Sequence, residues 1–145
     1  MRRMLGVAVL GLLAAWAVVL GAPEAGADCA GPTLRVNPTG GPGGSTVTLI
    51  GDYFGTNCYD TGPPPLGQGY LGLPQTGIAV TFTDAAGTPT TLATVDAGPQ
   101  YHFVAEVQIP ADAAIGAGSF QAGGALAVPF AVSGGVIPAT PAYTG

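Results

Sequence analysis

The chain has 145 residues, of which three are Lys or Arg and eight are Asp or Glu, so its formal net charge is −5 at pH 7. Two of the three cations, Arg2 and Arg3, lie at the N-terminus, and Arg35 is the only cation in the rest of the sequence. A chain with so few cations has no basic surface to meet phosphate groups. We therefore expect no nucleic-acid partner and no binding to anionic membranes.

Residues 1–27 have the three parts of a secretory signal peptide. Arg2 and Arg3 form the positive region, residues 5–20 form the apolar region, and Ala25-Gly26-Ala27 is a small-residue cleavage site. The alternative is an uncleaved membrane anchor, but the apolar run is short for a spanning helix, which needs about 20 residues. We predict a signal-peptide helix, cleavage before Asp28, no membrane span in the mature chain, and a protein that is secreted or associated with the cell wall.

Residues 28–133 form the one predicted domain. Its hydrophobic residues alternate with a period of two, which predicts short β-strands, and no helical stripe follows the signal peptide. Turn residues separate the strands at short intervals, which is typical of an all-β, immunoglobulin-like two-sheet β-sandwich of about seven strands. The alternating positions are Leu34 and Val36; Val47 and Leu49; Ile78, Val80 and Phe82; a weaker strand at residues 90–95; Tyr101, Phe103, Ala105, Val107 and Ile109; Phe120 and Ala122; and Leu126, Val128, Phe130 and Val132.

The segments between these strands predict turns. The run Pro-Thr-Gly-Gly-Pro-Gly-Gly at residues 38–44 should not continue a strand. Residues 84–87 and 96–99 predict hairpin-type connections. Pro129 lies within the last strand, which predicts that this strand is at a sheet edge or is bulged there.

The same alternation predicts the core, because a sandwich buries one face of each sheet. Seven side chains should be buried together: Val47, Leu49, Val80, Phe82, Phe103, Val107 and Phe130.

Cys29 and Cys58 are the only cysteines, and both lie after the signal peptide. An even number of cysteines in an exported chain predicts a disulfide, here between the N-terminus and the loop after the second alternating strand. A metal site is the alternative, but two thiols and one distant histidine are too few for structural zinc.

Two stretches do not fit a strand. Residues 58–77 contain three consecutive prolines and are long for a loop in a compact domain, and such loops are often functional. Tyr59, Tyr70, Leu71 and Leu73 lie in it outside the strand pattern, and we predict that they carry any binding, although an ornamental insertion is the alternative. Residues 134–145 have the composition of a flexible tail.

No residue pattern predicts catalysis. His102 is the only histidine, and the strand phase points it away from the core. No sequence motif places a serine nucleophile beside His102, so we expect neither a hydrolase nor any other enzyme. The acids are scattered over turns, and Asp52, Asp60 and Asp96 lack the spacing of a calcium loop. We therefore expect no catalytic residues, no metal and no cofactor.

The opening of the domain resembles an IPT/TIG domain, an immunoglobulin-like module found in proteins of many functions. Such domains often begin with the pattern P-x-x-G-x-x-G-x-x-V-T-h-x-G-x-x-F, where h is hydrophobic. The matching residues are Pro38, Gly41, Gly44, Val47, Thr48, Leu49, Gly51 and Phe54, and the second half is similar at Ile109, Pro110, Gly116, Phe130 and Val132. The resemblance covers residues 29–133 and implies a domain of an actinobacterial secreted protein, but residues 58–77 depart from the pattern.

A fainter resemblance is to the enediyne-carrier apoproteins of the neocarzinostatin kind, which usually carry two disulfides where this chain can form one. Together these observations favour an exported, non-enzymatic binding or structural module with an unknown extracellular protein, glycan or small molecule as partner. The alternative is a small-molecule carrier with a cleft lined by strands and the Tyr-containing loop. Because one fold hosts many activities, the fold alone does not decide between a binding or structural module and a small-molecule carrier.

Overall fold

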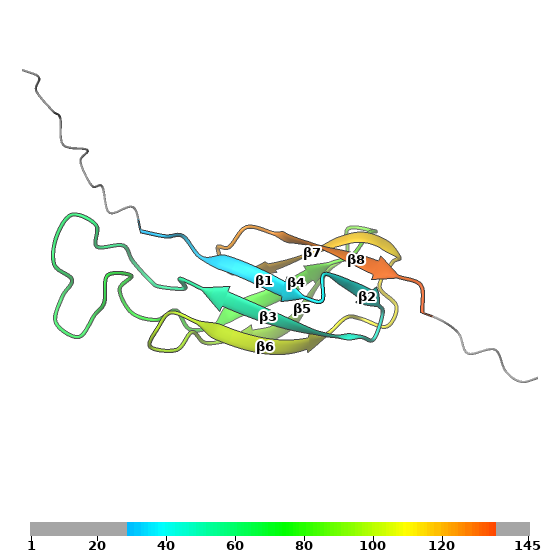
Figure 1. The fold of residues 1–145 in the computed structure, drawn as a ribbon, viewed down its shortest axis with the longest axis horizontal. Coiled ribbons are helices and arrows are strands. Elements are labelled where there is room, and N and C mark those ends of the chain that lie inside the picture. Colours follow the sequence, from blue (N-terminus) through cyan, green and yellow to red (C-terminus); the bar gives the residue numbers. More distant parts are fainter. Residues whose placement is uncertain (1–28, 136–145) are drawn as a thin grey trace, which may run out of the picture.

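The computed structural model describes residues 29–135, which form two β-sheets in two layers (Figure 1). The first sheet has the order β1-β3-β6, with β1 at Thr33–Asn37, β3 at Thr46–Asp52 and β6 at Phe103–Gln108. The second sheet has the order β2-β8-β7-β4-β5, with β2 at Gly40–Pro42, β8 at Val128–Ser133, β7 at Gly116–Ala122, β4 at Ile78–Thr83 and β5 at Pro89–Val95. Only β2 and β8 pair in parallel. The prediction of an all-β, immunoglobulin-like sandwich is confirmed, with eight strands in place of seven.

The core lies between the sheets and contains all seven of the side chains predicted for it. The rings of Phe82, Phe120 and Phe130 form its centre, with centroids 5.0–5.9 Å apart. A second aromatic pair, Phe54 and Phe103, has centroids 5.0 Å apart. Gly51 lies opposite Phe103 in the β3–β6 register, and a Cβ there would come within 2.2 Å of the Phe103 ring. The glycine and the aromatic residue of the opening pattern are therefore both required by packing around Phe103.

The expectation for residues 38–44 is wrong in part, because β2 is a strand within this run. Gly40 lies so close to β8 that a Cβ would be 2.9 Å from the carbonyl oxygen of Ala131. Glycine permits this close backbone approach, and the three residues pair with Ala131–Ser133. The Gly-Gly-Pro sequence has no side-chain alternation, so the strand could not be recognised from periodicity.

The turn at residues 84–87 is confirmed as the β4–β5 hairpin, closed by a hydrogen bond from Gly87 N to Asp84 O at 3.0 Å. The hairpin expected at residues 96–99 is wrong, because β5 and β6 belong to different sheets and this segment crosses between them. The last strand is shorter than the alternation predicts: β8 begins at Val128, so Leu126 lies before it and is 88% exposed.

The prediction that the last strand lies at a sheet edge or is bulged at Pro129 is wrong, because β8 lies between β2 and β7 in unbroken register. Pro129 is nevertheless on a side of β8 that has no neighbouring strand at that position. The amide of Ala131 donates to Thr39 O at 3.1 Å, on the side away from β7. The nitrogen of Pro129, two residues earlier, faces the same side, and β2 does not extend that far. Proline is tolerated there because no neighbouring strand needs its amide hydrogen. The predicted signal-peptide helix and residues 136–145 of the predicted tail lie outside the described residues.

Candidate functional site

The loop between β3 and β4, residues 53–77, extends beyond one end of the sandwich, at the left of Figure 1. Its two arms are joined by backbone hydrogen bonds: Thr56 N to Leu73 O at 2.9 Å, Asn57 N to Leu71 O at 3.1 Å and Tyr59 N to Tyr70 O at 2.8 Å. The hydroxyl of Thr56 also accepts a bond from Leu73 N at 3.1 Å. The loop is therefore an irregular hairpin that satisfies much of its own backbone.

Two turns shape the far part of this loop. Gln68 N donates to Pro65 O at 3.0 Å, and Gly69 and Gly72 exchange bonds of 3.2 and 2.9 Å, which places Tyr70 and Leu71 at the corner of a tight turn. The hydroxyl of Tyr59 donates to Gln68 Oε1 at 3.0 Å and links the two arms through side chains.

Tyr101, in the β5–β6 connection, anchors the loop to the sandwich. Its side chain is buried, and its hydroxyl donates to Gly72 O at 2.9 Å. The Tyr101 ring meets the Tyr70 ring edge to face, with centroids 5.8 Å apart. A Cβ at Gly69 would lie 2.1 Å from the Tyr101 hydroxyl, so only glycine allows this approach.

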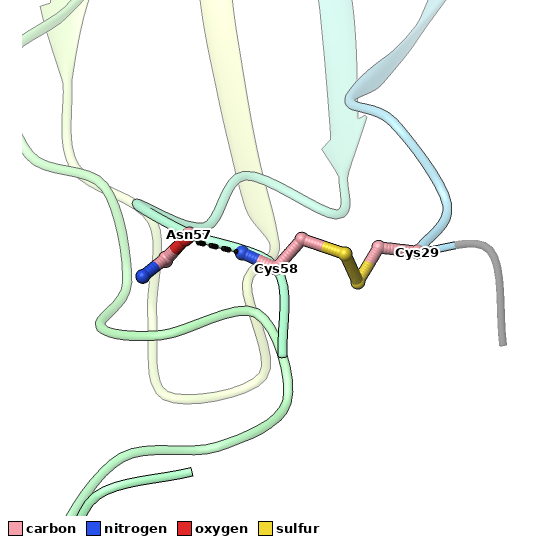
Figure 2. The surroundings of a disulfide bond; sticks show 3 residues. All are labelled: Cys29, Asn57 and Cys58. Carbon is pink, nitrogen blue, oxygen red and sulfur yellow. Dashed lines mark hydrogen bonds between the residues drawn. A yellow bond between two sulfur atoms is a disulfide. The ribbon is translucent and has the colours of Figure 1, made fainter. Parts of the chain in front are cut away.

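The disulfide between Cys29 and Cys58 is a second anchor, shown in Figure 2. It joins the segment before β1 to the first arm of the loop, with the two Cα atoms 5.8 Å apart, and the prediction is confirmed. The Cys58 amide donates to Asn57 Oδ1 at 2.8 Å. A disulfide is consistent with an extracellular protein, because such bonds persist in oxidising compartments.

The four side chains predicted to carry binding divide into two groups. Tyr70 and Leu73 are 51% and 50% exposed, and Tyr59 is half-buried. Leu71 is only 3% exposed, so it does not lie on the surface of the loop as the other three do, because the tight turn directs it inward. Sequence analysis missed Tyr53 and Leu66, which are exposed in the same loop. Leu66 follows the three prolines directly, and this position at a turn is the signal that could have identified it.

A cluster of polar and charged side chains lies where β3 meets the loop. Asp52 accepts a hydrogen bond from His102 Nδ1 at 2.9 Å through one oxygen and pairs with Arg35 at 2.9 Å through the other. The hydrogen bond from His102, together with the Arg35 ion pair, lowers the pKa of Asp52 below its ordinary value of 3.8, although partial burial opposes this shift. His102 points outward as predicted, but its bond to Asp52 was not foreseen.

This cluster has the acid and the imidazole of a catalytic triad. Among residues 29–135, no hydrogen bond joins a serine hydroxyl to His102, and Ser45 instead donates to Pro42 O at 2.6 Å. Asp96, named above in the search for calcium ligands, accepts a bond from Gly77 N at 2.7 Å and closes the end of the loop. In the part of the chain that the structure describes, no three His, Cys, Asp or Glu side chains are grouped so that they could hold a metal ion.

A shallow apolar groove of about 360 Å³ lies over β7 and β8, lined by residues that include Ala117, Gly118, Val128 and Pro129. No residue of the β3–β4 loop lines this groove. Within residues 29–135, no helix is long and apolar enough to span a membrane.

The sandwich and the opening pattern around Gly51 and Phe54 are the features on which the IPT/TIG resemblance depends. Compared with models of known protein families and with curated protein sequences, the chain gives no match, so membership of that family stays a prediction.

Proposed function

We propose that this chain is an exported, non-enzymatic binding module, an IPT/TIG-like immunoglobulin domain that engages an extracellular partner through its β3–β4 loop. The observation that carries the proposal is that one ordered loop exposes Tyr70 and Leu73 at its surface. The loop is held in place by the buried side chains of Leu71 and Tyr101. Exposed aromatic and aliphatic side chains on a pre-ordered backbone are typical of binding surfaces, because less freedom is lost on association.

The loop carries one formal charge, Asp60, among residues 53–77. A partner is therefore recognised by apolar contact and uncharged hydrogen bonds, and a strongly acidic or basic polymer gains nothing at this end of the molecule. This favours a neutral protein or glycan surface outside the cell.

The experiment is capture of exported material from the producing cells on the immobilised chain, with bound proteins and glycans compared between variants. Changing Tyr70 and Leu73 together to serine should abolish capture. Ile115→Ser is the matched control, because Ile115 is 71% exposed and belongs to the segment before β7, not to the loop. Capture that survives the double change in a folded variant would contradict the proposal. Deleting residues 61–76 is a poorer test, because it removes buried Leu71 and the Gly72 carbonyl that Tyr101 binds.

A carrier of small apolar molecules is the second candidate, favoured by the β7–β8 groove. Its volume of about 360 Å³ falls at the small end of the range for ligand pockets, and its lining is mostly apolar. Ala117→Leu should fill the groove and weaken the binding of an apolar fluorescent dye, whereas Tyr70→Ser should not change it.

A further inference from the structure

We propose that the β3–β4 loop is a self-association surface, at which the loops of two copies of this chain pack against each other about a two-fold axis. The surface consists of Pro63, Pro64, Pro65, Leu66, Tyr70 and Leu73, and we call it the loop surface. The inference rests on the proposed function in taking this loop as the binding site, and it names a second copy as the partner.

The loop surface contains both halves of one recognition chemistry. Each proline holds its own φ near −65° and confines the residue before it to extended conformations, so residues 63–65 are preset as a short polyproline II segment. All three prolines are exposed, and Leu66 beyond them is fully exposed. Polyproline II segments dock against exposed aromatic rings at little cost in entropy. The same loop presents such a ring in Tyr70.

A surface that holds both the proline segment and the ring is complementary to itself. In a two-fold arrangement the prolines of one copy meet the Tyr70 region of the other, and each contact occurs twice. The edge contact of Tyr101 with the Tyr70 ring and the hydrogen bond from Tyr59 to Gln68 order this surface before any partner arrives.

The charges of the described residues favour contact at this end over contact between sheet faces. Arg35 is their only Lys or Arg, against six acids, and five of those acids lie outside the loop. Two such sandwiches repel each other, but the repulsion is screened beyond about 8 Å at physiological ionic strength. The loop extends past the end of both sheets (Figure 1), so two copies can touch there while their acidic sandwiches stay apart.

The size of the surface sets the expected strength. Leu66 is fully exposed and Tyr70 and Leu73 are half exposed, so these three offer roughly 300–400 Å² of side-chain surface per copy, since a whole aromatic side chain buries about 150–250 Å². The three exposed prolines enlarge this area, but it stays below the roughly 800 Å² per partner of a standard interface. Interfaces this small belong to the weak and transient class. We expect a dissociation constant on the order of 10⁻⁴ M.

The test is sedimentation equilibrium of the exported protein, with its disulfide intact, from about 10 μM to 1 mM. The weight-average mass of the unchanged protein should rise toward that of a dimer, and higher salt should strengthen association by screening the acids. Changing Tyr70 and Leu73 to serine should weaken association at least tenfold. Leu66→Ser, a change at a fully exposed side chain, should also weaken it, and Tyr70→Phe and Ile115→Ser should leave it unchanged.

Three results would overturn the inference: a monomer at every concentration, a dimer that persists in the folded Tyr70 and Leu73 variant, or a dimer lost in Ile115→Ser. Pelleting of the monomeric protein with phosphatidylcholine vesicles would assign the surface to a membrane and overturn it as well. The capture experiment is separate, so loss of captured material in the Tyr70 and Leu73 variant, from a protein that stays monomeric, would reject self-association and leave the proposed function standing.

Discussion

Replacing Tyr101 by phenylalanine removes one oxygen atom and tests whether the loop is held by the sandwich. The Tyr101 hydroxyl is buried and donates to Gly72 O at 2.9 Å. Phenylalanine keeps the ring and its contact with Tyr70, so only the hydrogen bond is lost. The loop should open more often, while the sandwich keeps its stability.

The magnitude follows from the partners of Gly72 O. A buried hydrogen bond contributes about 0.5–1.5 kcal/mol net, and more is lost when a partner is left unsatisfied. Gly72 O keeps a second donor, the Gly69 amide at 3.2 Å, so it is not orphaned. We expect a loss of about 1 kcal/mol, which raises the opening equilibrium of the loop about fivefold.

Amide hydrogen exchange measures this opening directly. Exchange at Gly69 and Tyr59, whose amides bond within the loop, should become about fivefold faster. Exchange at Val47 and Val107, which pair between β3 and β6, should not change. Tyr53→Phe is the matched control, because it removes the same atom from an exposed ring in the same loop. Equal acceleration in loop and core, or none in the loop, would refute the claim that Tyr101 anchors it.

Three further predictions concern stability. Phe103→Ala should lower the free energy of unfolding by about 3–5 kcal/mol in urea titration, because it empties the space between Gly51 and Phe54, and a loss below about 1 kcal/mol would mean that the face assignment is wrong. Removing the disulfide with Cys29→Ser and Cys58→Ser together should cost about 3–4 kcal/mol by the same titration, since the bond spans 29 residues; an unchanged midpoint would contradict this. The folded-state pKa of Asp52 is lowered, so its contribution to stability is present above its ordinary pKa of 3.8 and is lost as the pH falls through the folded value. Asp52→Asn should therefore lower the free energy of unfolding at pH 6, and this difference from the unchanged protein should shrink as the pH is lowered to 2. A difference that stays constant with pH would contradict the prediction.

The strands and the core could be predicted because they depend on local alternation. Val47 and Leu49 in β3 or Val80 and Phe82 in β4 keep a period of two, and burial of one face follows from it. Gly40 and Gly41 in β2 have no side chains to alternate, and their pairing with β8 depends on a backbone approach between residues about 90 positions apart.

Which side chains of the loop are buried and which are exposed could not be predicted, for a different reason. Tyr70 and Leu71 are adjacent and both apolar, and only the tight turn between Gly69 and Gly72 separates an exposed ring from a buried side chain. The hydroxyl of Tyr101, which is about 30 residues away in the chain, orders that turn by donating to Gly72 O. Composition therefore identified the loop as unusual, but the geometry that divides its residues comes from a tertiary contact.

The same tertiary contacts explain how a 25-residue connection without regular strands could act as the binding surface that we propose. A long free loop would lose much of its entropy on association and bind weakly. Here Cys29 holds the first arm, the Tyr101 hydroxyl holds the turn, and Asp96 holds the amide of Gly77 where the loop returns to β4. Cys29 lies before β1, and Tyr101 and Asp96 both lie in the β5–β6 connection. The ordering entropy of the loop is therefore lost on folding, and the binding that we propose would begin with Tyr70 and Leu73 already in place. A change that weakens an anchor should therefore weaken binding even though it touches no residue of the loop surface.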